Sequence, residues 1–332
     1  MSQPPAAAAT AAVAAVADEL FAADEREGIT LALVVCQHGE VVFERYGRQP
    51  DTAFGPGGPV DADTTLVSWS MAKSITHAAV GLAVADGVLE VDAPAPVPAW
   101  QGTDKAAITV LDLLEMRPGL EFVEDYVDDS VSHCIDMLYG SGQADMAAYA
   151  AALPLVHEPG SVWNYSSGTT NIVARIVGDA VGGGRPGMET YLAERLFGPL
   201  GMSSAVPKFD DAGTFVGSSF VYATARDFAR FGQLYLDDGV TAGRRLLPEG
   251  WRDHGRTQIA FDPDGGFGYG RHWWIWPEFA GSMAAHGYEG QYTLVEPARD
   301  LVVVHLGKVP AVHRPRVRDA LARIVVAFEP TA

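Results

Sequence analysis

The chain has 332 residues, of which 48% are hydrophobic and 20% charged, and its formal net charge is −19. This length and composition suit one or two globular domains with a large core. The acidic excess argues against nucleic acid and anionic membranes as partners, because both need a basic face, and it favours neutral or cationic substrates. No run reaches the roughly 18 apolar residues of a membrane span, and the N-terminus lacks the basic start of a secretory signal. Two cysteines make no disulfide framework. We therefore expect a cytoplasmic protein.

The N-terminal quarter is predicted to form a helix, a hairpin and a second helix. Residues 6–23 are rich in alanine and favour a helix. Two β-branched runs, 30–37 and 41–46, are separated by a short glycine-containing turn and indicate a hairpin. An apolar helix-forming run follows, with Ser68 as its candidate N-cap and Gly87 as its candidate C′ glycine.

The middle of the chain is predicted to be mainly helical, and strand patterns return after residue 265. Helical patterns cover 109–116, 145–152, 169–181, 188–197 and 224–236, the last with Thr224 as N-cap. Strand patterns cover 268–276, 292–296 and 301–306, and an amphipathic helix covers 316–328. Trp273, Trp274 and Trp276 cannot all face one way on a strand, so we expect some of them in the core and one or two on the wall of a cleft.

Sheet-forming segments therefore lie at both ends of the chain. This order predicts an α/β protein of the α+β type, with an antiparallel sheet flanked by the terminal helices. We expect residues 1–90 and 261–332 to form this sheet domain, and residues 91–260 to form an inserted, mainly helical domain. A cleft between two such parts is a common place for a site.

The first candidate motif is the tetrad Ser70-Met71-Ala72-Lys73 at the start of a predicted helix. Residues three apart share one face of a helix, so Lys73 is expected beside Ser70. A serine becomes a nucleophile when a nearby base removes its proton. Burial and a helix N-terminus disfavour a charged amine, and this environment lets a lysine act as that base.

Two further motifs are weaker when taken alone. Tyr165 lies in a Y-x-S segment before a predicted helix, and a tyrosine beside a cation can relay protons; the alternative is an ordinary packed tyrosine. Residues 285–291 stand beside a predicted strand, and Gly287 lets the backbone come close to a ligand; the alternative is a plain connecting loop.

The order and spacing of the three motifs resemble the serine β-lactamase/penicillin-binding-protein superfamily. S-x-x-K at 70–73, Y-x-S at 165–167 and the G-x-x-G-Q ending at 287–291 look like its class C-like branch. That branch includes the family VIII carboxylesterases and the 6-aminohexanoate-dimer (nylon-oligomer) hydrolases. Glu124-Asp125-Tyr126 adds to the likeness with the last group. The resemblance implies a β-lactamase/transpeptidase-like fold.

The resemblance also implies roles for individual residues. Ser70 matches the acylated nucleophile, and Lys73 and Tyr165 match the pair that moves its proton. The backbone N–H groups of Ser70 and Tyr288 match the oxyanion hole. The residues expected to contact the substrate are Tyr126, Ser167, His286 and Gly287.

Two positions depart from the family pattern. Ala285 replaces the lysine that opens the third motif of β-lactamases, which removes the partner of a β-lactam carboxylate. Ser167 replaces the asparagine of many relatives and has a shorter reach. The acidic loop 121–129, which includes Asp128, selects amino-bearing substrates or is simply a solvated loop.

The sequence thus predicts a serine hydrolase that acts on small carboxylic esters or linear amides through an acyl-enzyme. A D-amino-acid peptidase, a β-lactamase or an acyltransferase on the same scaffold stays open, as does a silent binding protein. No metal-binding or nucleotide-binding motif occurs, so neither a metal nor a cofactor is expected. A homodimer is also left open.

Overall fold

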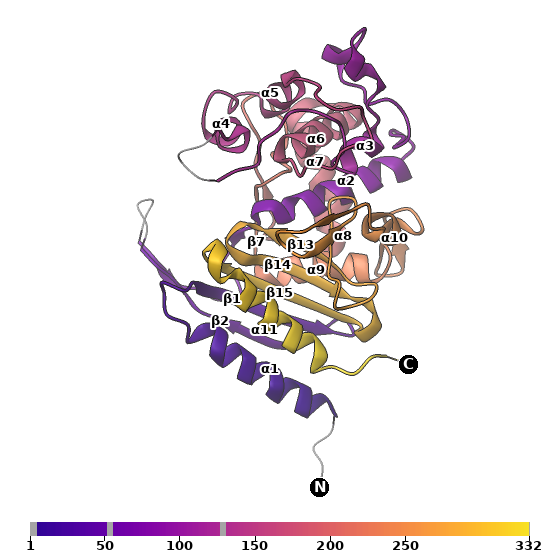
Figure 1. Cartoon of the computed structure of the whole chain (residues 1–332). Coiled ribbons are helices and arrows are strands. Elements are labelled where there is room, and N and C mark those ends of the chain that lie inside the picture. Colours follow the sequence, from indigo (N-terminus) through magenta and orange to yellow (C-terminus); the bar gives the residue numbers. More distant parts are fainter. Residues whose placement is uncertain (1–4, 52–55, 127–130, 332) are drawn as a thin grey trace.

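The centre of the protein is an eight-stranded antiparallel sheet (Figure 1). The computed structural model describes residues 5–51, 56–126 and 131–331. The strands, in sheet order, are β10 (Ala260–Asp262), β11 (Phe267–Tyr269), β12 (Trp274–Ile275), β13 (Met283–Gly287), β14 (Gln291–Glu296), β15 (Leu301–Lys308), β1 (Ile29–Gln37) and β2 (Glu40–Tyr46). Because β15 pairs with β1, the two ends of the chain build one sheet, as the sequence predicts.

The central strands are buried on both faces, and their side chains alternate between two cores. On β1, Leu33 and Val35 belong to one hydrophobic cluster, and Val34 belongs to the other. Val34 pairs with Val304 of β15 in the antiparallel register. A one-residue slip would exchange the two sets, so the buried alternation fixes this register.

Helices cover both faces of the sheet. On one face α1 (Pro5–Phe21) lies beside α11 (Arg314–Val326), as Figure 1 shows. On the other face α9 (Ala225–Leu236) packs against β14 and β15. A Cβ on Gly232 would lie only 2.6 Å from Val302 Cγ1, so glycine permits this close approach. α9 belongs to the stretch 91–260 that was predicted as the helical domain, yet it packs on the sheet. The predicted boundary at residue 260 stays a prediction.

The helical region stands beyond α2 (Ala72–Ala85), which Figure 1 shows between it and the sheet. Its helices are α3 (Val110–Leu114), α4 (His133–Tyr139), α5 (Met146–Ala152), α6 (Ser167–Val181) and α7 (Gly184–Tyr191), whereas Figure 1 shows α8 (Gly198–Leu200) and α10 (Trp251–Arg256) on the sheet side of α2. Short strands pair outside the main sheet: β3 (Arg48–Gln49) with β4 (Gly58–Pro59), β5 (Leu66–Val67) with β7 (Val221–Ala223) and β6 (Val206–Pro207), and β8 (Val240–Thr241) with β9 (Arg244–Arg245). None of the described helices is long and apolar enough to cross a membrane.

Several predicted elements differ in detail. The strand expected over 268–276 is two strands, β11 and β12, joined by a turn, because His272 adopts the left-handed conformation with φ of 60°. Residues 192–197 continue α7 as a π-helix. The cap of the helix at 224 is as predicted: Thr224 Oγ1 accepts a hydrogen bond from the Asp227 N–H at 3.2 Å.

Candidate active site

Ser70 lies in a short 3₁₀ turn, Trp69–Met71, that leads directly into α2. The predicted capping role of Ser68 is wrong: its hydroxyl donates to the carbonyls of Trp69 (2.9 Å) and Ser219 (3.2 Å) and makes no cap hydrogen bond. Trp69 has a left-handed φ of 43°, a strained conformation for a bulky residue. Its indole N–H donates to Glu289 Oε2 at 3.2 Å, which ties the turn that carries Ser70 to the loop after β13.

The glycine predicted to allow a close approach does so against the protein backbone. A Cβ on Gly287 would lie 2.4 Å from the Ser68 carbonyl oxygen, so no larger residue fits there without a shift. The end of β13 therefore lies against the turn that carries Ser70, and Tyr288 follows immediately. Ser70 and Tyr288 line the same cavity. The oxyanion hole formed by their N–H groups stays a prediction that this proximity supports.

Lys73 is only 2% exposed and faces three acceptors. Its Nζ donates to Ser70 Oγ at 3.1 Å, to Ser167 Oγ at 2.9 Å and to the Ser218 carbonyl at 3.0 Å. These three bonds use all the donors of an ammonium group. The same short separation from Ser70 would let a neutral amine accept the serine proton.

Tyr165 lies next to the Ser70–Lys73 pair. Lys73 Nζ is 4.9 Å from the centroid of its ring. Burial raises the pKa of the Tyr165 phenol, while the charge of Lys73 and hydrogen bonds with Ser70 and Lys73 act in the opposite direction. The ring packs on Trp274, with centroids 5.3 Å apart. The structure thus brings the three predicted catalytic side chains into one cluster.

Glu124 is a member of the site that sequence reasoning placed only within an acidic loop. Its Oε2 accepts the Ser167 N–H at 2.7 Å, and its Oε1 accepts the Ser167 hydroxyl at 2.6 Å. Because that hydroxyl donates its hydrogen bond to Glu124, an oxygen lone pair of Ser167 is left to accept the hydrogen bond from Lys73. No local motif signals this contact, since 43 residues separate the two positions.

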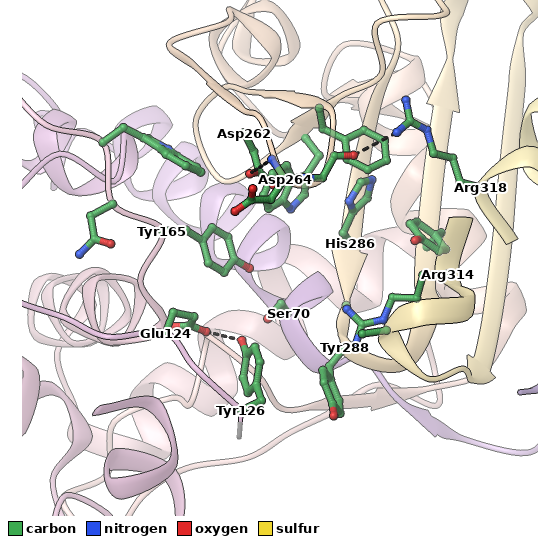
Figure 2. Close-up of a pocket in the computed structure, with 18 of the residues that line it drawn as sticks. Ser70, Glu124, Tyr126, Tyr165, Asp262, Asp264, His286, Tyr288, Arg314 and Arg318 are labelled. Carbon is green, nitrogen blue, oxygen red and sulfur yellow. Dashed lines mark hydrogen bonds between the residues drawn. The ribbon is translucent and has the colours of Figure 1, made fainter. Parts of the chain in front are cut away.

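Glu124 also holds Tyr126, whose hydroxyl donates to Oε1 at 2.5 Å. The Tyr126 ring lies 5.1 Å from the ring of Tyr288, and both rings line the cavity (Figure 2). Tyr126 is therefore on the cavity wall, and its contact with a substrate stays a prediction. Asp128 of the predicted acidic loop lies outside the described residues, and the carboxylate of Glu124 is committed to protein donors.

His286 lines the cavity beside an aromatic group. Its Nε2 accepts the Trp276 indole N–H at 2.8 Å, and its ring stacks on Trp274 with centroids 5.3 Å apart. Burial, followed by the charges of Arg318 and Arg314, lowers the His286 pKa well below its usual value. We infer that His286 is neutral at pH 7.

The division of the tryptophans is as predicted: Trp273 and Trp276 are buried in the core, and Trp274 is on the cavity wall.

The cavity has a volume of about 790 Å³ and opens over Ser70. Its wall carries carboxylates (Glu124, Asp262 and Asp264) and arginines (Arg314 and Arg318), as Figure 2 shows. Asp262 accepts hydrogen bonds from the N–H groups of Asp264 and Gly265, so it stabilises its own turn. Ala285 is buried on β13, 1% exposed, and adds no cation to this cavity.

The antiparallel sheet, the helical region and the serine–lysine pair between them define a protein of the serine β-lactamase fold. A family model described as Beta-lactamase matches residues 13–328, and the chain belongs to that family. The family match indicates that the protein is a hydrolase of this fold, in agreement with the resemblance of its motifs.

Individual relatives agree with this assignment. The chain is 29% identical over 307 residues to the 6-aminohexanoate-dimer hydrolase of Paenarthrobacter ureafaciens, covering 86% of this chain and 74% of that one. A solved Bacillus anthracis structure, provisionally assigned as a 6-aminohexanoate-dimer hydrolase, superimposes with a TM-score of 0.75 at 23% identity over 93% of this chain and 80% of that one. A class C β-lactamase bound to cefoxitin gives 0.70 at 14% identity over 98% of this chain and 100% of that one. The predicted fold is confirmed.

Proposed function

We propose that this protein is a serine hydrolase that cleaves small carboxylic esters or linear amides through an acyl-enzyme on Ser70. The observation that carries the proposal is the position of Lys73 Nζ, 3.1 Å from Ser70 Oγ in a buried site. A lysine that only stabilised the fold would not need to face a serine hydroxyl on a cavity wall.

The geometry supports a two-step reaction. Ser70 Oγ attacks the substrate carbonyl while the Lys73–Tyr165 pair accepts its one proton, for which the pair must start with either a neutral Lys73 amine or a Tyr165 phenolate. The N–H groups of Ser70 and Tyr288 stabilise the oxyanion, and loss of one such donor typically costs about 10²–10³ in rate. Tyr165 then protonates the leaving alcohol or amine as the carbonyl re-forms. Water attacks the acyl-enzyme in the second step, and the same groups return the proton to Ser70.

The relative from Paenarthrobacter ureafaciens supports the amide arm of this proposal, because it is named a 6-aminohexanoate-dimer hydrolase. Ala285 argues against β-lactams, since no cation stands at the start of the third motif. We therefore expect no useful turnover of nitrocefin.

The direct test is intact-mass spectrometry after treatment with a fluorophosphonate, together with turnover of p-nitrophenyl butyrate. We expect one adduct that maps to Ser70 and a measurable rate. If the protein shows no adduct and no turnover, the result contradicts the proposal and favours a silent scaffold. Product analysis with added amine, alcohol or D-amino-acid amide separates a hydrolase from an acyltransferase or a D-amino-acid peptidase. Light scattering tests whether the protein forms a homodimer.

A further inference from the structure

Each of the two proposed oxyanion donors adjoins a residue in the left-handed conformation. Ser70 and Tyr288 both line the cavity (Figure 2). Trp69, with φ of 43°, directly precedes Ser70, and Glu289, with φ of 61°, directly follows Tyr288. The planar peptide unit that contains the Ser70 N–H begins at Trp69, so the backbone angles of Trp69 set the direction of this donor. A residue with a large side chain seldom adopts the left-handed region, and it stays there only when its surroundings hold it.

One hydrogen bond joins these two left-handed residues. The Trp69 indole N–H donates to Glu289 Oε2 at 3.2 Å, although 220 positions separate the two residues in the chain. Both residues are half-buried, so water competes only in part for this bond. A hydrogen bond to a carboxylate is also stronger than one between neutral groups. The bond therefore connects the turn that carries Ser70 with the loop between β13 and β14.

The backbone of that loop is held by groups other than Trp69. The Tyr288 carbonyl accepts a hydrogen bond from Gln291 Nε2 at 3.1 Å, and the Glu289 carbonyl accepts one from the Val309 N–H at 3.0 Å. Gly287 pairs with Gln291 in the register of β13 and β14, so only three residues make the connection. The loop thus gives the Glu289 side chain a fixed base.

The Trp69 side chain also packs on two aromatic rings. The Tyr288 ring lies 5.8 Å away at an interplanar angle of 85°, and the Phe220 ring lies 5.7 Å away at 51°. A phenylalanine ring could make similar contacts, because they need only an aromatic surface. The hydrogen bond needs the indole N–H, so it alone selects the edge of the ring that faces Glu289.

We propose that Glu289 is a positioning residue for the oxyanion hole of the proposed hydrolase. Through the Trp69 indole it holds the peptide unit of the Ser70 N–H and the loop of Tyr288 in one relative position. This role rests on the proposed function and adds to it a residue that touches neither the substrate nor the reacting atoms. Since like charges repel, a carboxylate near a developing oxyanion is unfavourable, so the useful property of Glu289 is its hydrogen bond and not its charge.

Glu289→Ala and Glu289→Gln separate the hydrogen bond from the charge. We expect Glu289→Ala to lower kcat for p-nitrophenyl butyrate by about ten- to a hundredfold, because a small displacement of a donor has such an effect. Formation and hydrolysis of the acyl-enzyme both use the oxyanion hole, so kcat falls whichever step limits the rate. Glu289→Gln keeps an acceptor oxygen and should retain at least about a third of the wild-type kcat.

Glu249→Ala is the matched control, because it removes the same charge at an exposed position. We expect it to have the wild-type kcat. The proposal is overturned if Glu289→Ala keeps the wild-type kcat, or if Glu289→Gln loses as much activity as Glu289→Ala. It is also overturned if both variants change only KM for amine-bearing esters, since the carboxylate would then bind substrate.

A double-mutant cycle tests the route through Trp69. Trp69→Phe keeps an aromatic ring but removes the indole N–H, and we expect it to lower kcat by a factor similar to that of Glu289→Ala. Both changes remove the same bond, so the double variant should be within about threefold of the slower single variant. Losses that multiply in the double variant would mean that Glu289 acts independently of Trp69, which contradicts the proposal.

Crystal structures of the wild-type protein and of Glu289→Ala separate this proposal from the proposed chemistry. We expect Trp69 to leave its φ of 43° in the variant, and the N–H groups of Ser70 and Tyr288 to change their relative position. A variant that keeps both N–H groups in place contradicts the positioning role, even if esters are cleaved. If the N–H groups move but the wild-type protein neither labels nor turns over, the positioning by Glu289 is supported and only the hydrolase function is contradicted.

Discussion

Glu124 accepts two hydrogen bonds from Ser167, one from its N–H at 2.7 Å and one from its hydroxyl at 2.6 Å. The carboxylate thereby fixes both the first turn of α6 and the direction of the hydroxyl that faces Lys73. Ser167 itself is 2.9 Å from Lys73 Nζ. A carboxylate from a loop thus orients the base of the proposed reaction through one intermediate side chain.

Replacement of Ser70 by alanine is expected to reduce ester turnover by about 10³-fold or more, because it removes the nucleophile. Ser70 is half-buried and its hydroxyl is not needed for packing, so the free energy of unfolding should change by less than about 1 kcal/mol. Turnover of p-nitrophenyl butyrate and urea unfolding measure the two effects. A variant that keeps most of the wild-type rate would exclude Ser70 as the nucleophile.

Glu124→Gln is expected to lower kcat and to move the limb of the pH–rate profile that reports Tyr165 toward lower pH. The reason is that the charge of Glu124 raises the pKa of the Tyr165 phenol, and the amide removes this contribution. Glu121→Gln, an exposed change in the same loop, is the control and should leave the profile in place. A lower kcat with an unshifted profile would indicate a purely structural role for Glu124.

Gly287→Ala should separate the two sides of the site. The new Cβ would meet the Ser68 carbonyl at 2.4 Å, so β13 must move away from the turn that carries Ser70. We expect a loss of stability of about 1–3 kcal/mol and a loss of about 10²-fold or more in kcat as the Tyr288 donor is displaced. Gly58→Ala, whose Cβ meets no atom within 4 Å, is the control. Wild-type activity in Gly287→Ala would show that this approach is not needed.

Stability should fall in mild acid because several histidines are buried in their neutral form. Burial lowers the pKa of His305 and of His254 to about 4, and that of His272 to about 3. The unfolded chain binds their protons near pH 6.5, so each histidine costs stability as the pH falls below that value, by about 2 kcal/mol between pH 6.5 and 5. Urea unfolding at pH 7 and 5 measures the loss.

His305→Gln checks the assignment of that loss. His305 Nδ1 donates to the Gly290 carbonyl at 2.7 Å, and its Nε2 is 3.1 Å from Thr30 Oγ1, so the neutral ring satisfies both neighbours. The variant should be less stable at pH 7, yet its stability should depend less on pH between 7 and 5. An unchanged pH dependence would mean that other groups cause the acid loss.

Local patterns were sufficient to predict β1, β2, β14, β15 and the Ser70–Lys73 pair, but they did not predict β10 or β13. Three-residue spacing on a helix is a local property, and the apolar run of β1 is visible in its own letters. The hydrogen bonds between Glu124 and Ser167, and between Trp69 and Glu289, join residues far apart in the chain. Only the completed fold brings these pairs together.

Tertiary contacts also decide two features that no local pattern contains. The Ser68 hydroxyl has the chemistry of an N-cap, but it bonds to the Ser219 carbonyl, which lies 151 residues away. The helix at 225–236 follows the helical region in the chain, yet Gly232 lets it pack on the sheet at Val302. In both cases a partner distant in sequence decides the outcome, and a sequence window cannot contain it.

The pairing of β1 with β15 has a consequence for how the protein is made. Ile29 of β1 lies opposite Lys308 of β15, so a ribosome must release nearly the whole chain before the middle of the sheet can close. Until then β1 has only β2 as a partner and exposes a long apolar edge, and β13, with Tyr288 after it, is not yet held against the turn that carries Ser70. Folding should therefore be slow and late, as long-range strand pairing generally is, and in a newly synthesised chain the proposed active site around Ser70 is completed only in the final stage of assembly.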